Sequence, residues 1–197
     1  MSVGGRPVRL EISVRRPFPE PEPVMPLRRM PRLVTKDGTI LARQLDAYAN
    51  NGAYASHGHA ICANCGNVFK DLYRDRLGAE IDCWTVYTSS PTAGAMRGYG
   101  IPQAAWFAEC LTDDMATAIG MDPYEFRMKN CMEDGFVDPA NGITFHTYGL
   151  KKCMEAGKKY IHWDEKREAY KNQTGPVRTG RGNGYFLLQD RCTSYFP

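Results

Sequence analysis

Three stretches of the chain alternate between apolar and polar positions with the period of two that is typical of β-strands. The first, 8–14, sets four apolar side chains against arginine, glutamate and serine. The other two are 40–49, which follows the turn Lys36-Asp37-Gly38, and 80–88. The last carries apolar residues on both sides, which favours an interior strand. We expect the three strands to share one sheet.

After residue 101 this alternation ends, and apolar residues recur every three to four positions. Pro102 suits the first position of a helix, and Gly120 ends the run. One apolar face is expected to be buried, made of Ala104, Ala108, Leu111, Met115 and Ala118.

Three further helices are predicted downstream. Asp122 caps a helix over 123–130, with proline at its first position. A second helix covers 150–160, and its inward side chains are expected to be Leu150, Cys153, Met154 and Gly157. A third, 163–171, is highly charged and predicts a solvated face. Together these elements predict an α+β fold, a mixed sheet with packed helices.

Between the last predicted strand and the helix that begins near Pro102 lies a turn rich in small residues. Its glycines, Gly94, Gly98 and Gly100, allow positive φ or a close approach of the main chain to a bound group. The helix start that follows offers N–H groups and a partial positive charge, which suit an anionic ligand. Spacing alone is weak support for a site, because most such turns are only turns.

The residues of this turn carry a family resemblance. The string AGAMRGYGIPQAAWFAEC resembles the AFRGFGxPQ segment of the large, molybdenum-cofactor-binding subunit of the xanthine dehydrogenase and aldehyde oxidase family. The flanking stretches GRPVRLEIS, DGTILARQLDAYANNGAYASHG and MDPYEFRMKN are similar to that family as well. The fold implied is part of the molybdopterin-binding domain of a larger subunit.

The resemblance implies a cofactor and roles for four residues. The cofactor is molybdenum held by molybdopterin, and the implied reaction is hydroxylation of a purine, another N-heterocycle or an aldehyde with oxygen from water. Met96, Arg97 and Gly98 are the implied cofactor-binding residues, with the Arg97 backbone N–H near the molybdenum ligands. Tyr99 is implied to stack on the substrate. In animal xanthine oxidases of this family an arginine binds the purine substrate, and this sequence has no arginine at the corresponding position near Cys65.

The chain lacks other parts of the family pattern. The glutamate base of a GEP-type motif and the FGGK- and GQG-type glycine loops do not occur, so no catalytic base is assigned. We therefore expect an internal fragment of an oxidoreductase subunit that is inactive alone. The implied partners are the rest of that subunit, subunits or domains carrying FAD and 2Fe–2S clusters, and a small substrate.

Residues 15–32 divide the chain into three parts. Six prolines, with basic residues at both ends, replace the acidic and Arg-His-Pro pattern that the family resemblance implies there. A linker, a proline-rich ligand and an altered coding segment are alternative interpretations, and we favour the last. The expected division is a strand region 1–14, the divergent segment 15–32 and the cofactor-domain fragment 33–197.

Composition excludes some classes of function. The chain has 197 residues, 43% of them hydrophobic, and a net charge of +3 that gives little support for nucleic-acid binding. Neither a signal peptide nor a bilayer-spanning apolar stretch is recognisable, so a cytoplasmic protein is expected, with no membrane partner.

Two alternatives to a molybdenum enzyme fragment remain. His57, His59, Cys62 and Cys65 offer four ligands within nine positions, including a CxxC step, and could form a small zinc module. No second cysteine pair completes that pattern. The other alternative is a non-catalytic remnant of a broken gene.

Overall fold

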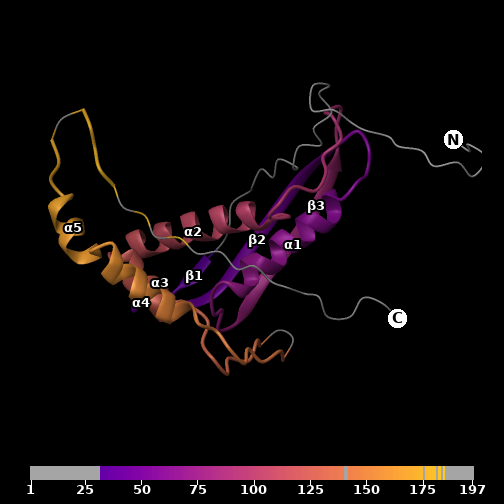
Figure 1. Ribbon diagram of the computed structural model, residues 1–197. Helices are drawn as coiled ribbons and strands as arrows, with labels where there is room; N and C mark the ends of the chain where they lie inside the picture. Colours follow the sequence, from indigo (N-terminus) through magenta and orange to yellow (C-terminus); the bar gives the residue numbers. More distant parts are fainter. Residues whose placement is uncertain (1–31, 140–141, 175, 181, 183, 185–197) are drawn as a thin grey trace, which may run out of the picture.

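A computed structural model describes residues 32–139, 142–174, 176–180, 182 and 184. Its elements form an α+β fold with a mixed sheet and packed helices, as predicted (Figure 1). In chain order they are β1 (Arg32–Val34), β2 (Ile40–Gly52), α1 (Gly58–Asp71), β3 (Gly78–Tyr87), α2 (Ile101–Ala118), α3 (Pro123–Asn130), α4 (Leu150–Tyr160) and α5 (Trp163–Ala169).

The described sheet has three strands in the order β1-β2-β3. β1 and β2 form the predicted hairpin, whose turn places Gly38 at φ +85°, and β2 and β3 are parallel. Two of the three predicted strands therefore share a sheet, whereas 8–14 lies outside the described residues. The prediction of an interior position for β3 was wrong within the described sheet, where β2 is central. Strand order depends on pairing partners, which the apolar pattern of one strand does not reveal.

Helix α1 connects the parallel strands and covers one face of the sheet (Figure 1). Gly66 brings α1 close to β3, because a Cβ there would lie 2.7 Å from the Ile81 Cγ2 atom. On the opposite face Tyr48 and Trp84 are register partners, and their rings stack with centroids 4.7 Å apart. No helix of the described part covers this second face (Figure 1).

Helix α2 packs against α1 and has most of the predicted buried face. The exception is Ala118, which is exposed because α2 ends there, and the buried position in the last turn is Ala116. The predicted cap of α3 is confirmed: Asp122 accepts hydrogen bonds from the backbone N–H groups of Tyr124 and Glu125.

Asn130, the last residue of α3, joins that helix to the β1–β2 hairpin. The Ile40 N–H donates to its side-chain oxygen at 2.9 Å. Its amide group donates to the carbonyl oxygens of Gly38 at 2.7 Å and Phe126 at 2.9 Å. All three bonds are buried, so one side chain satisfies polar groups from two elements 90 residues apart.

Two buried arginines hold other parts of the scaffold. Arg43 on β2 donates to both carboxylate oxygens of Asp75, at 2.8 and 2.7 Å, and lies over the Phe69 ring of α1. Arg127 on α3 donates to Glu109 of α2 at 2.8 Å. Removing Arg43 leaves the buried Asp75 carboxylate without this partner, which is strongly destabilising.

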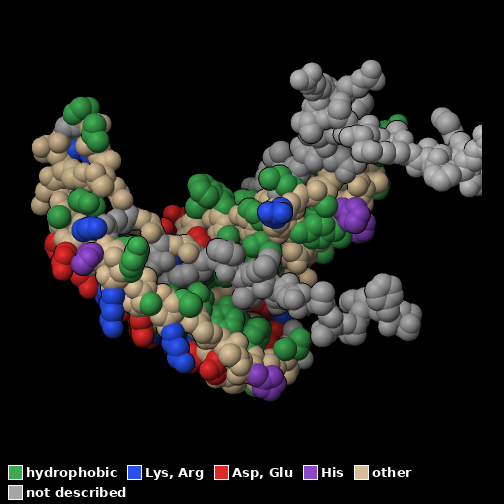
Figure 2. All heavy atoms as spheres, viewed as in Figure 1, with side chains coloured by type: hydrophobic (Ala, Val, Ile, Leu, Met, Phe, Trp, Pro, Cys, Tyr) green, Lys and Arg blue, Asp and Glu red, His purple; other side chains and the backbone are tan. Residues whose placement is uncertain are grey.

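Helices α4 and α5 extend away from the sheet as an arm (Figure 1). Acidic and basic side chains alternate along its outer edge (Figure 2), in agreement with the charged face predicted for 163–171. The inward face predicted for α4 was wrong at Cys153 and Gly157, which are exposed, because only a narrow strip around Met154 meets the body. Among the described helices, none combines the length and apolar character needed to cross a bilayer.

We expect Asn130→Ala to lower the free energy of unfolding by about 3 kcal/mol, because it removes three buried hydrogen bonds and leaves the Ile40 N–H unpaired. The control is Asn67→Ala, at an exposed position of α1, with an expected change within about 0.5 kcal/mol. Urea unfolding of both variants measures the difference. Equal losses would show that Asn130 does not join the hairpin to α3.

Candidate functional site

The candidate site lies where the parallel strands end. The Thr88 N–H donates to the Gly52 carbonyl and the Ala93 N–H to the Asn51 carbonyl, each at 3.0 Å, so the segment after β3 follows the end of β2. Gly52 allows this approach, because a Cβ there would lie 2.0 Å from the Pro91 carbonyl oxygen. The carboxyl ends of parallel strands are a common position for ligands in open α/β sheets.

Three consecutive residues of the loop 94–100 have left-handed backbone conformations. Gly98 has φ +105°, Tyr99 φ +48° and Gly100 φ +90°. At Gly100 the main chain lies directly against α1, because a Cβ would be 2.4 Å from the Ile61 carbonyl oxygen. At Gly98 a Cβ would meet the Pro102 side chain at 2.8 Å. The glycines are therefore required by the loop itself, whatever the loop binds.

The predicted residues Met96, Arg97, Gly98 and Tyr99 lie together on one turn. Met96 is 61% exposed, Arg97 is exposed, and Gly98 and Tyr99 are partly buried. Within the part of the chain that is described, the backbone N–H groups of Arg97 and Gly98 donate to no protein acceptor. The turn therefore presents backbone donors and one aromatic side chain.

Helix α1 holds this turn from the other side. The Asn64 amide donates to the Tyr99 carbonyl oxygen at 2.7 Å. The Tyr99 hydroxyl lies 2.9 Å from His57 Nδ1, and the two rings meet edge to face. The Tyr99 N–H donates to the Met96 carbonyl at 2.9 Å. Tyr99 is thus anchored at its N–H, its carbonyl and its hydroxyl.

Sequence reasoning missed α1 and therefore missed Asn64 and the structural role of His57. The available signal was the recurrence of Ile61, Cys65, Val68 and Leu72 at four- and three-residue steps, all of which are buried. The glycines at both ends of HGHAICANCG obscured that pattern.

The positions of the four possible zinc ligands, at the start of α1 and within it, do not support the zinc alternative. Cys62 and Cys65 are 1% and 0% exposed and belong to the core, whereas His57 and His59 are exposed. A hydrogen bond with Cys83 and burial raise the pKa of the Cys62 thiol, which disfavours the thiolate that zinc requires. Among the described residues, no three His, Cys, Asp or Glu side chains gather around a possible metal position.

Two glutamates downstream of the motif, Glu109 and Glu125, make contacts elsewhere in the fold. Glu109 accepts hydrogen bonds from Tyr73 and Arg127. Burial and the charge of Glu109 raise the pKa of Tyr73, so the phenol remains a donor to that carboxylate. Glu125 lies in a different region, beside α4 and α5. No catalytic base is therefore assigned.

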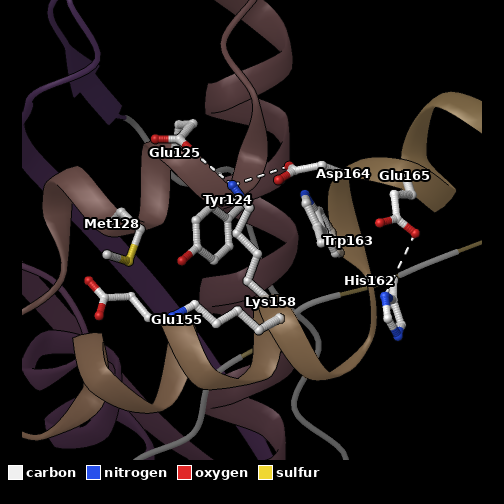
Figure 3. Close-up of a pocket in the computed structure, with 10 residues that line it drawn as sticks. Tyr124, Glu125, Met128, Glu155, Lys158, His162, Trp163, Asp164 and Glu165 are labelled. Atoms are coloured by element: carbon white, nitrogen blue, oxygen red, sulfur yellow. Dashed lines mark ion pairs between the residues drawn. The ribbon is translucent and has the colours of Figure 1, made fainter.

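A cavity of about 590 Å³ lies between α3, α4 and α5, away from the loop (Figure 3). Figure 3 shows Lys158 between Glu125 and Asp164, with ion pairs of 3.6 and 3.2 Å. The ammonium group also lies 4.7 Å from the Tyr124 ring centroid. None of the predicted site residues lines this cavity, and its Lys158 is already paired, so we place the candidate site at the loop.

Two buried oxygen atoms beside the loop have no hydrogen-bond partner in the described part of the chain. One is Asn51 Oδ1, on a residue that is 2% exposed, next to the start of α1. The other is Gln103 Oε1, in the first turn of α2. Buried acceptors of this kind are normally paired, so both suit a donor from a bound group.

Comparison with known proteins identifies relatives of this chain. A family model described as the molybdopterin cofactor-binding domain matches residues 29–131, just over half of the chain. The putative xanthine dehydrogenase molybdenum-binding subunit XdhA of Escherichia coli K12 is 42% identical over 153 residues. That match covers 78% of this chain and 20% of the relative, so the chain spans about a fifth of its length.

Other relatives differ in their named substrates. The nicotinate dehydrogenase large molybdopterin subunit of Eubacterium barkeri is 32% identical over 125 residues, 64% of this chain and 29% of that protein. The solved structure of an aldehyde oxidoreductase from Desulfovibrio gigas is 30% identical with a TM-score of 0.63. The matched region covers 71% of this chain and 15% of the aldehyde oxidoreductase chain.

Alanine substitutions at two left-handed glycines, Gly100 and Gly120, test whether the loop lies against α1. Gly120→Ala adds a Cβ in open space and costs only the backbone strain, about 1 kcal/mol. Gly100→Ala adds the same strain plus the overlap with the Ile61 carbonyl, and we expect it to lose about 2 kcal/mol more. Urea unfolding measures both. The same loss in the two variants would mean that the loop does not lie against α1.

Proposed function

The chain belongs to the molybdopterin cofactor-binding domain family, and from this premise we propose that it supplies the loop 94–100 to the molybdenum site of a larger hydroxylase subunit. The observation that carries the proposal is the loop's backbone: three left-handed residues fixed on α1, with the Arg97 and Gly98 N–H groups left available. Such donors cost no reorganisation when an electron-rich group binds, because their orientation is already fixed.

The described residues fit the proposed cofactor. Met96, Arg97 and Gly98 would bind it through their main chain, because Gly98 has no side chain to keep a bound group away. A pterin carries N–H groups along its edge, and the unpaired oxygens of Asn51 and Gln103 would accept from such donors. When bound, the molybdenum cofactor supplies the redox chemistry that hydroxylates an electron-poor carbon with oxygen from water.

Tyr99 has a separate role in the proposal. Its ring stands on the same turn as the backbone donors and is partly exposed, so a planar substrate would stack on it beside the bound cofactor. The substrate would be a purine, another N-heterocycle or an aldehyde. The general base, the FAD and the 2Fe–2S clusters would come from other parts of the enzyme.

We expect the purified chain to show no xanthine or aldehyde oxidation, even when the cofactor is supplied, because it contains no assigned base and only part of the pocket. Turnover is measured with an artificial electron acceptor. Oxidation at a rate above the buffer control would overturn the proposal that this segment contributes one loop to a larger site.

The loop itself is tested in a chimera in which residues 33–160 replace the matching segment of the E. coli XdhA subunit. We expect full molybdenum content and xanthine oxidation. Tyr99→Ala should retain the metal but lose about 1 kcal/mol of aromatic contact, a fivefold fall in kcat/KM. The matched control is Trp106→Ala, which removes an exposed aromatic side chain from α2 and should change neither value. A normal kcat/KM in Tyr99→Ala would remove Tyr99 from the substrate site.

A further inference from the structure

We propose that His57 is a positioning residue that fixes the ring of Tyr99 in one orientation. The part of this inference that concerns substrate stacking rests on the proposed function, whereas the part that concerns the ring itself does not. The recognised motif around Arg97 does not include this histidine, which lies 42 positions before Tyr99.

The contacts to the loop come from one side of α1. His57, Ile61 and Asn64 are spaced by four and three residues, which places them in one row along the helix. Each makes a different contact: His57 with the Tyr99 hydroxyl, Ile61 through its carbonyl with the Gly100 main chain, and Asn64 with the Tyr99 carbonyl. The row therefore holds both the backbone and the far end of one side chain.

Tyr99 needs such support because its backbone is strained. A residue with a Cβ pays about 1–2 kcal/mol for the left-handed conformation, so the position persists only where neighbours hold it. The bonds to Met96 and Asn64 fix the backbone and do not act on the side chain, which packs against the core. The bond from the hydroxyl to His57, at 2.9 Å, restrains the first torsion, and the edge-to-face contact of the two rings restrains the second.

The geometry of the pair is consistent with positioning. The rings are edge to face, with centroids 6.1 Å apart and planes at 76°. The hydroxyl end of the Tyr99 ring therefore meets the imidazole. A ring held at its edge keeps a face for a planar ligand, and fixing it in advance removes an ordering cost from binding.

The first test uses the 197-residue chain and no cofactor. NMR order parameters of the Tyr99 ring are measured with ¹³C-labelled tyrosine in His57→Phe, which keeps a ring but removes the hydrogen bond, and in His57→Gln, which restores a polar partner. We expect a lower order parameter in His57→Phe and recovery in His57→Gln. His59→Phe, an exposed position two residues further along α1, is the control and should match the parent.

An unchanged order parameter in His57→Phe would overturn the positioning role. Tyr99→Phe provides a second route to the same bond, because it removes the hydroxyl while α1 keeps its sequence. Its ring should become as mobile as in His57→Phe. A Tyr99→Phe ring as ordered as the parent ring would also overturn the proposal.

The second test uses the XdhA chimera and the kinetics per molybdenum atom. We expect His57→Phe and Tyr99→Phe each to lower kcat/KM for xanthine about fivefold, the value of one hydrogen bond, with molybdenum content unchanged. The double variant should lose no more than either single variant, because the same bond is removed twice. His57→Gln should restore most of the loss.

Additive losses in the double variant would overturn the inference that His57 acts through Tyr99. The two proposals fail separately. A chimera without molybdenum would refute the proposed function but leave the ring measurements on the isolated chain intact. A chimera with metal and normal kinetics in His57→Phe would refute the effect on stacking alone.

Discussion

The close approach of two main chains, at Gly100 and Ile61, is the constraint on which the candidate site depends. A carbonyl of α1 occupies the space that a side chain at Gly100 would need. The loop can therefore reach its position only with glycine there, and its neighbours must then adopt conformations that continue from a left-handed residue. The strain at Tyr99 and the start of α2 at Ile101 both follow from this one contact.

The hydrophobic core between the sheet, α1 and α2 keeps that contact in place, and three polar contacts add to it. Asn130 ties α3 to the hairpin, Arg127 ties α3 to α2, and Arg43 ties β2 to the segment after α1. Each contact joins residues distant in sequence, and those of Asn130 and Arg43 are buried. Buried polar groups of this kind are costly to leave unpaired, so they specify one arrangement of the elements more sharply than apolar contacts do.

Elements with local signals could be predicted from the sequence. The cap at Asp122, the proline at the start of α2 and the turn at Gly38 each act within a few residues, and the structure has them where expected. The motif around Arg97 also placed four residues on one turn. Long-range features could not be predicted in this way. The edge position of β3, the contact of Gly100 with α1 and the bond between His57 and Tyr99 depend on which distant segments meet, and no local pattern encodes that.

Strand β3, which carries Trp84 of the Tyr48–Trp84 stack, affects how the isolated chain behaves at high concentration. Trp84, Val86 and Tyr87 are exposed on β3, and the outer edge of that strand pairs with no strand in the described part of the chain. An apolar strand with an open edge is a template for pairing with another chain. Within the described residues, pairing of this edge with another copy of the chain would compete with folding as concentration rises.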